Sequence, residues 1–188
     1  MLYLIGGPAR SGKSLLARRL LHLRQAPYFC ADYLMSGLSA GAPGLAIGHE
    51  LASRARGERI WPVLVGVLRN LVEVEPEYAV EGDVLLPGRV AELRAEYEGQ
   101  IRACFMGYPR CSPKAKVASM RAHPSPVNDW VAGMSENQLL GLVVEMVDFS
   151  KYLEAECKVH RISFFDGSLN FPLALQRAER YLVGDGAA

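Results

Sequence analysis

A glycine-rich run near the start of the sequence has the residue types best suited to chemistry. Gly7, four further residues, then Gly12, Lys13 and Ser14 form the pattern GxxxxGK[ST] inside the segment GGPARSGKS. Glycines let the backbone curl so that its N–H groups surround phosphate oxygens. A helix opening at Lys13 would add its free N–H groups and positive dipole end. Lysine then reaches the β- and γ-phosphates and serine ligates Mg²⁺. The pattern predicts a nucleotide-phosphate site.

The flanking sequence supports this prediction. LYLI precedes the loop and SLLARRLL follows it, which gives the strand and the helix that such a loop needs. A glycine turn that binds no nucleotide is the alternative. The guanine motif NKxD and the transporter signature LSGGQ are both missing from the sequence, so we expect ATP and Mg²⁺ as cofactors. The residues expected to contact the nucleotide are Gly7, Pro8, Ala9, Arg10, Ser11, Gly12, Lys13, Ser14 and Leu15.

Asp32 is the candidate general base. It follows a predicted strand in the segment YFCADYL. The carboxyl ends of parallel strands line the ligand crevice of an open sheet, so Asp32 should lie across the phosphates from the glycine-rich loop. A carboxylate there orients an acceptor hydroxyl and takes its proton. Capping of the following helix is the alternative role.

The two segments together resemble a known kinase branch. GGPARSGKS followed by FCADYL is similar to the chloramphenicol phosphotransferase and zeta-toxin branch of P-loop kinases. An aspartate after the second strand is the catalytic base in that branch, so the resemblance implies this role for Asp32. VEGDVLLPG also resembles a stretch of 2-phosphoglycerate kinase-like proteins. The similarity covers mainly residues 1–90, and it implies a reaction class without identifying the acceptor.

Two acids end the third predicted strand, in AVEGDVLLP. Glu81 and Asp83 are Walker B-like by position and could hold Mg²⁺ directly or through water. The sequence does not favour one over the other. A turn with both acids facing solvent is the alternative.

Basic residues gather after the fourth predicted strand, in YPRCSPKAKVASMR. Phosphoryl transfer needs cations over the moving γ-phosphate, and a lid helix can supply them. Arg121, just before the segment HPSPVNDW, is the first candidate and Arg110 the second. Lys114 and Lys116 lie on the same predicted helix, with Lys116 to one side. A solvated basic face is the alternative.

Two further groups of residues are assigned by position. The acceptor cap is expected to hold His49, Glu50, Arg54, Arg56, Arg59 and Trp61. Its arginines would suit a phosphorylated or carboxylated acceptor, although a surface helix would look the same. Asp166 and Ser168, in FFDGSLNF, occupy the place where related kinases hold adenine, and turn chemistry alone would also explain them.

Short apolar runs alternate with helical patterns along the chain, which is typical of a parallel sheet covered on both faces. We predict α/β architecture, a three-layer α/β/α P-loop NTPase fold that is nucleotide-kinase-like. The five predicted strands are 2–5, 28–31, 78–80, 101–106 and 161–165. Residues 1–188 should form one domain, with a substrate cap at about 36–60 and a lid at about 108–134. Ser36–Gly48 and His123–Gly133 are expected to be irregular functional loops.

Helix start signals complete the pattern. Ser135 and Gln138 form a capping box, Ser112 precedes a proline at the first helical position, and Asn170 could cap the last helix. A further helix is expected to start at Pro87.

Composition narrows the partners. The net charge of +1 gives no electrostatic reason to expect nucleic acid or a membrane surface. The four cysteines lack zinc spacing and predict free, mostly buried thiols, with Cys30 and Cys104 in the core. Neither a signal peptide nor an apolar run of ~20 residues is present, so a cytoplasmic location is expected.

Together these residues predict an ATP- and Mg²⁺-dependent kinase that moves the γ-phosphate to a hydroxyl or phosphate of a small molecule. The alternative is a P-loop regulator or slow ATPase that acts through a partner. Oligomeric state is not readable from the sequence.

Overall fold

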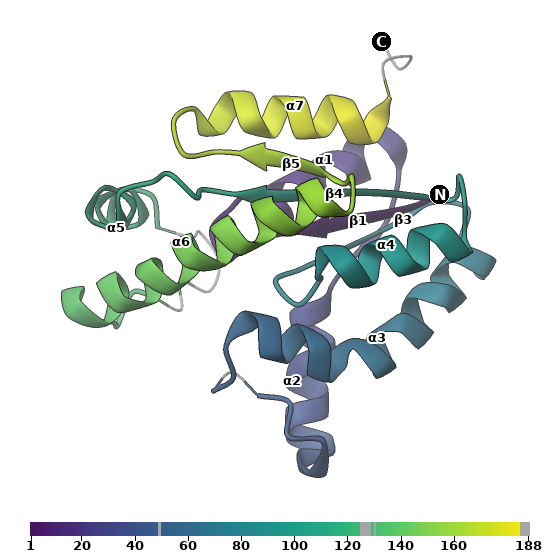
Figure 1. Cartoon of the computed structure of the whole chain (residues 1–188), viewed down its shortest axis with the longest axis horizontal. Helices are drawn as coiled ribbons and strands as arrows, with labels where there is room; N and C mark the ends of the chain where they lie inside the picture. Colours follow the sequence, from purple (N-terminus) through teal and green to yellow (C-terminus); the bar gives the residue numbers. More distant parts are fainter. Residues whose placement is uncertain (49, 125–128, 130, 185–188) are drawn as a thin grey trace.

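The computed structural model describes residues 1–48, 50–124, 129 and 131–184. One sheet of five parallel strands has the order β2-β3-β1-β4-β5 (Figure 1). Its strands are β1 (Leu2–Gly6), β2 (Tyr28–Cys30), β3 (Tyr78–Gly82), β4 (Ile101–Gly107) and β5 (Ser163–Asp166). All five predicted strands are confirmed. The last begins two residues later than predicted, because Arg161 has a left-handed φ of 52° that a strand cannot contain.

Seven α-helices and one 3₁₀ turn occur in the described part of the chain. They are α1 (Lys13–Arg24), α2 (Ala31–Gly41), η1 (Pro43–Leu45), α3 (Ser53–Val74), α4 (Pro87–Glu96), α5 (Pro113–Ala122), α6 (Glu136–Val159) and α7 (Phe171–Val183). The predicted capping box is confirmed at α6, where Ser135 and Gln138 bond reciprocally. Asn170 caps α7 by accepting from the Leu173 N–H. The starts predicted at Pro87 and Pro113 are also confirmed.

The prediction of an irregular loop at Ser36–Gly48 is wrong in its first half. α2 continues to Gly41, because the alanine and leucine residues of this stretch favour a helix and outweigh its glycines. Part of the second predicted loop lies outside the described residues, namely residues 125–128 and 130. Its described remainder is turn and irregular structure.

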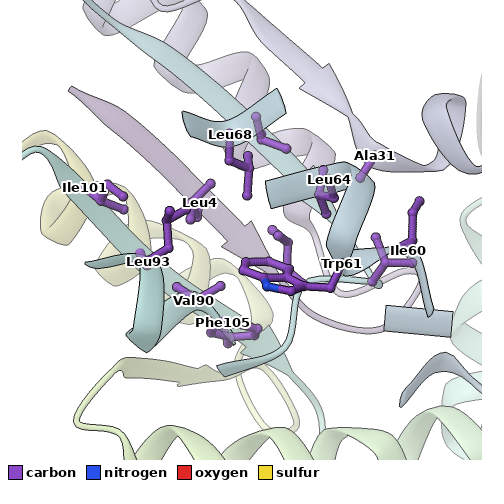
Figure 2. Packing of buried hydrophobic residues seen from close by; sticks show 14 of the residues in the cluster. Leu4, Ala31, Ile60, Trp61, Leu64, Leu68, Val90, Leu93, Ile101 and Phe105 are labelled. Atoms are coloured by element: carbon purple, nitrogen blue, oxygen red, sulfur yellow. The ribbon is translucent and has the colours of Figure 1, made fainter. Parts of the chain in front are cut away.

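Two hydrophobic clusters sandwich the sheet, which confirms the three-layer prediction. Leu4 of β1 belongs to a cluster covered by α2, α3, α4 and the C-terminal end of α6. Its neighbours Tyr3 and Ile5 point to the opposite face, against α1 and α7, because side chains alternate along a strand. Figure 2 shows Trp61, Leu64 and Leu68 of α3 gathered with Leu4 and with Phe105 of β4.

A third cluster lies outside the sheet sandwich, between α5 and the N-terminal part of α6. Its buried members are Tyr108, Val117, Met120, Val131, Leu139, Val143, Met146 and Val147. We call it the lid cluster, because it lies within the predicted lid and its extension into α6. α6 runs from α5 to the sheet, and its far end reaches the first cluster through Leu153 and Cys157 (Figure 1).

All four cysteines are free thiols. Cys104 and Cys157 are buried, but Cys30 is only half-buried, so its assignment to the core is wrong. It is the last residue of β2, the edge strand of the sheet, where α2 begins and covers it less completely. Of the described helices, none is both long enough and apolar enough to span a membrane.

Candidate functional site: a phosphate loop beside a buried acid cluster

The glycine-rich loop connects β1 to α1 at the carboxyl edge of the sheet. Gly7 and Gly12 have φ of 144° and 98°, in the region that favours glycine. A Cβ atom at Gly7 would lie 2.2 Å from the Met106 carbonyl oxygen, so β4 leaves no room for a side chain there. The loop backbone therefore packs directly against the neighbouring strand.

The inner side of this loop is rich in hydrogen-bond donors. Gly12 is the N-cap of α1 and has no side chain with which to bond the first N–H groups of the helix. Lys13 is only 7% exposed and donates from Nζ to the Pro8 carbonyl, 2.9 Å away. The buried Ser11 Oγ has no partner among the described residues. Helix N–H groups, a lysine and a free hydroxyl at one turn fit a nucleotide's phosphates.

Side chains from beyond β4 hold the outer side of the loop. The Tyr108 hydroxyl donates to the Ala9 carbonyl at 2.7 Å, and Lys116 Nζ donates to the Arg10 carbonyl at 3.0 Å. The same ammonium lies 3.9 Å from the centre of the Tyr108 ring. Burial lowers the pKa of Lys116 to about 8. Together with the bond from Lys13 to Pro8, the carbonyls of three consecutive residues, Pro8, Ala9 and Arg10, accept hydrogen bonds from side chains.

The sequence did not single out Tyr108, and it set Lys116 aside. The position of Tyr108 at the carboxyl end of β4 was the available signal. Arg10 extends the same connection, because its guanidinium pairs with Asp129 and donates to the His123 carbonyl at 3.4 Å. The glycine-rich loop is thus bonded to both α5 and the segment that follows it.

Glu81 and Asp83 have different partners. Ser14 Oγ donates to Glu81 Oε1 at 2.9 Å, and Glu81 is only 4% exposed. Asp83 Oδ2 instead accepts from Arg56 Nη2 at 2.6 Å. A serine hydroxyl beside a carboxylate offers the oxygen ligands that Mg²⁺ prefers, with phosphate and water completing the shell. Among the described residues no group of three or more His, Cys, Asp or Glu side chains could hold a metal ion. The oxygen ligands of the Ser14–Glu81 pair fit a Mg²⁺ ion that phosphate and water also ligate.

Asp32 lies in the first turn of α2 and is half-buried. Its Oδ1 atom has no hydrogen-bond partner in the described part of the chain. Burial raises the pKa of Asp32 to about 6, and the negative charge of Asp83 adds to the rise while Lys13 opposes it. The N-cap of α2 is Cys30, and no described side chain caps this helix. The alternative role of Asp32 as a helix cap is therefore not what its geometry shows.

Arg56, from the predicted acceptor cap, joins an acid cluster that consists of Asp32, Glu81 and Asp83. It is 9% exposed, and besides Asp83 it donates to Ser53 Oγ at 3.0 Å. The other cap residues do not make this contact. Trp61 packs in the core, and the Arg54 guanidinium lies 4.9 Å from the centre of the Tyr152 ring. Glu50 and Arg59 are exposed, and His49 lies outside the described residues.

The two predicted lid arginines have structural partners. Arg121 donates to the carbonyls of Val131, Ala132 and Met134, so it fastens the end of α5 to the following turn. The exposed Arg110 pairs with Asp166 at 2.5 Å and with Glu154 at 2.8 Å.

The predicted adenine-side residues join Arg110 rather than standing apart. The Arg110 backbone N–H donates to Ser168 Oγ at 3.0 Å, and Ser168 in turn bonds Asp166. The structure therefore brings Arg110, Asp166 and Ser168 together, while the Arg121 guanidinium bonds carbonyls of residues 131–134 and not the glycine-rich loop.

Comparison with known proteins places the fold. No protein-family model matches the chain, and no curated protein matches it. A shikimate kinase from Bacteroides thetaiotaomicron matches with a TM-score of 0.58 at 12% identity, over 98% of this chain and 99% of that one. A gluconokinase from Sinorhizobium meliloti 1021 matches with a TM-score of 0.55 at 18% identity, over 97% and 90%. The chain has the fold of P-loop small-molecule kinases.

A shikimate kinase from Acinetobacter baumannii in complex with shikimate gives a TM-score of 0.59 at 12% identity, over 100% of this chain and 95% of that one. Such low identities carry the fold and not the substrate. The resemblance to the chloramphenicol phosphotransferase and zeta-toxin branch stays a prediction, and the P-loop kinase part of it agrees with these structures.

Proposed function

We propose that this protein transfers the γ-phosphate of ATP to a hydroxyl group of a small molecule, with Asp32 as the general base. One observation carries the proposal. Asp32 has a buried, unpartnered carboxylate oxygen within the described residues, and it lies in one electrostatic cluster with Lys13 and Glu81. A carboxylate with a raised pKa beside a phosphate loop is what proton removal from an acceptor requires.

The loop residues bind the donor. The backbone N–H groups of the glycine-rich loop, except at Pro8, which has none, and those of the α1 N-terminus receive the phosphates, and Lys13 exchanges its bond with Pro8 for a β- or γ-phosphate oxygen. Ser14 and Glu81 are the residues that would hold Mg²⁺, with Asp83 as the less favoured ligand because Arg56 occupies it. When bound, Mg²⁺ neutralises negative charge on the phosphates.

Asp32 acts on the acceptor. The hydroxyl oxygen forms a bond to the γ-phosphorus, its proton passes to Asp32, and the bond from phosphorus to the bridging oxygen breaks to release ADP. A pKa of about 6 keeps Asp32 ionised at neutral pH while leaving it a better base than an ordinary aspartate.

The lid, the acceptor cap and the residues beside adenine are assigned from the contacts described above, all within a single proposed domain. We assign residues of about 108–134 as the lid and residues of about 36–60 as the acceptor cap. Lys116 is the lid cation that already touches the glycine-rich loop, and we assign it to holding that loop from its outer side. Arg121 and Arg110 would have to leave their present partners to contact the γ-phosphate. Asp166 and Ser168, with Arg110, flank the adenine.

Asp32→Asn tests the proposal. We expect Mg·ATP affinity, measured by calorimetry, to be retained while phosphate transfer falls by about 10²–10⁴-fold. Asp148→Asn, at an exposed acid of α6, is the matched control. Unchanged transfer in Asp32→Asn would remove Asp32 from catalysis. If no acceptor raises ATP consumption in either protein, the regulator or slow-ATPase alternative replaces the kinase proposal.

A further inference from the structure

The arginine best placed to receive an acceptor is already neutralised by the protein itself. Arg56 and Asp83 form a close ion pair whose side chains are only 11% and 15% exposed. An arginine reserved for a carboxylate or phosphate group of the acceptor would present a free guanidinium fork. Here an internal carboxylate occupies part of that fork, so an anionic acceptor would have to compete with Asp83.

The buried polar atoms of this cluster that lack a hydrogen-bond partner also indicate which acceptor would fit it. Within the described residues, Asp32 Oδ1, Asp83 Oδ1 and Arg56 Nε are buried without a partner. Two of these atoms accept hydrogen bonds and one donates. A hydroxyl group can do both, whereas a carboxylate or phosphate oxygen has no hydrogen to give to Asp32 or Asp83. Hydroxyl and ammonium groups therefore complement the cluster better than anions do.

The net charge of the residues that would face the acceptor also favours an acceptor without negative charge. In the proposed function, Lys13 faces the phosphates and Glu81 faces Mg²⁺, which leaves Asp32, Asp83 and Arg56 for the acceptor. Two carboxylates against one guanidinium give this group a net negative charge. A negatively charged acceptor would lie beside it in a site with little water, where like charges repel most strongly.

We infer that the acceptor is an uncharged or cationic polyhydroxylated molecule, such as a sugar, a cyclic polyol or an amino sugar, and that Asp83 excludes anionic acceptors. Asp83 is then a specificity-determining residue, held by its ion pair with Arg56 in the same electrostatic cluster as the base Asp32. This inference rests on the proposed kinase function and gives its acceptor a chemical class.

The test uses acceptors matched in shape and different in charge. Phosphate transfer from Mg·ATP is measured with glucitol against gluconate, glucose against glucuronate, methyl shikimate against shikimate, and glucosamine as the cation. We expect kcat/KM for the uncharged or cationic member to exceed that for the acid by at least about tenfold. A preference for the acid of any transferred pair overturns the inference.

Two variants connect the preference to Asp83. Asp83→Asn keeps an oxygen for Arg56 but removes the charge, so we expect the preference over acids to shrink by about tenfold with Mg·ATP affinity unchanged. Asp83→Glu keeps the charge and should keep the preference. Glu58→Gln is the matched control, since Glu58 is an exposed acid of α3 that pairs with Arg89. An unaltered preference in Asp83→Asn, with circular dichroism showing an intact fold, also overturns the inference.

The remaining outcomes separate this inference from the function on which it rests. Transfer to acids alone leaves the kinase proposal standing and removes the acceptor class. Binding of Mg·ATP with no transfer to any compound removes both. Weakened Mg·ATP binding in Asp83→Asn would assign Asp83 to the metal rather than to the acceptor.

Discussion

The glycine-rich loop and the acid cluster lie at the same edge of the sheet but are held in different ways. Backbone geometry shapes the loop, in which the carbonyls of Pro8, Ala9 and Arg10 each accept from a side chain and glycines lie against β4. The acid cluster depends on the balance of charge between Arg56 and its carboxylates. An added methyl group should therefore distort the loop, and a changed charge should destabilise the cluster.

The largest effect should come from removing the cation of the cluster. Arg56→Met leaves Asp83 as a buried carboxylate without its partner, so the free energy of unfolding should fall by about 3–5 kcal/mol. Urea denaturation measures this loss. Arg69→Met, on the same helix, removes an exposed pair with Glu96 and should cost less than about 1 kcal/mol. Equal losses in the two variants would show that the cluster does not depend on charge.

Adding one methyl group to the loop tests the other half of the comparison. Gly7→Ala would place its Cβ against the Met106 carbonyl in a backbone conformation that alanine rarely adopts. We expect ATP affinity to fall about 100-fold, equivalent to about 3 kcal/mol. Calorimetric titration with Mg·ATP checks this, and an affinity within a factor of two of the unmodified protein would contradict it.

Neutralising Asp32 should stabilise the fold while removing activity. Its folded pKa of about 6 exceeds the ordinary value of 3.8, so the folded state binds more protons in that window and stability falls as pH rises through it. The full difference corresponds to about 3 kcal/mol. We therefore expect Asp32→Asn to gain about 2 kcal/mol at pH 7 and nothing below pH 4. Denaturation at both pH values measures this, and a gain independent of pH would exclude titration of Asp32 as its cause.

Lys116, in the proposed lid, donates to the Arg10 carbonyl of the glycine-rich loop, so its removal should loosen the loop and weaken ATP binding. Lys116→Met should raise the KM for ATP about tenfold, equivalent to about 1.4 kcal/mol. In the unmodified protein the KM should also rise above pH 8, as this ammonium loses its proton. Steady-state kinetics from pH 7 to 9 measure both effects. Lys114→Met, at an exposed position of the same helix, is the control and should leave the pH profile unchanged.

The smallest effect is expected where a glycine has no role in the loop or the cluster. Gly141 of α6 is exposed, and a Cβ there would meet no described atom within 4 Å. Gly141→Ala should raise the free energy of unfolding by about 0.5–1 kcal/mol without changing ATP affinity. Thermal unfolding measures the gain in stability. A loss of ATP affinity would show that this position of α6 affects nucleotide binding.

The comparison also explains which features could be predicted from the sequence. The strands, the position of the segment Gly7–Ser14 between a strand and a helix, and the capping box at Ser135 depend on local patterns, and the structure confirms each of them. Ser36–Gly41 was misread because glycines suggested a loop where the helix propensity of the neighbouring residues prevails.

The sequence could not predict which side chains pair when they come from helices and strands far apart in the chain. Glu81 and Asp83 look equivalent in the segment VEGD, and only the arrival of Ser14 at one and Arg56 at the other distinguishes them. Arg121 looked well placed for the γ-phosphate, yet its guanidinium meets carbonyls of the following turn. Such pairings depend on three-dimensional packing that short-range spacing does not encode.

Because α6 belongs to two hydrophobic clusters, it can act as a lever. Ser150 lies between the two halves, fully buried, where its hydroxyl donates to the Met146 carbonyl and accepts from the Tyr108 N–H. If the N-terminal half of α6 tilts with the lid cluster, it would turn about Ser150 while the C-terminal half stays packed against the sheet. Amide hydrogen exchange should then divide the helix at Ser150 when nucleotide binds, with slower exchange on the lid side and little change on the sheet side.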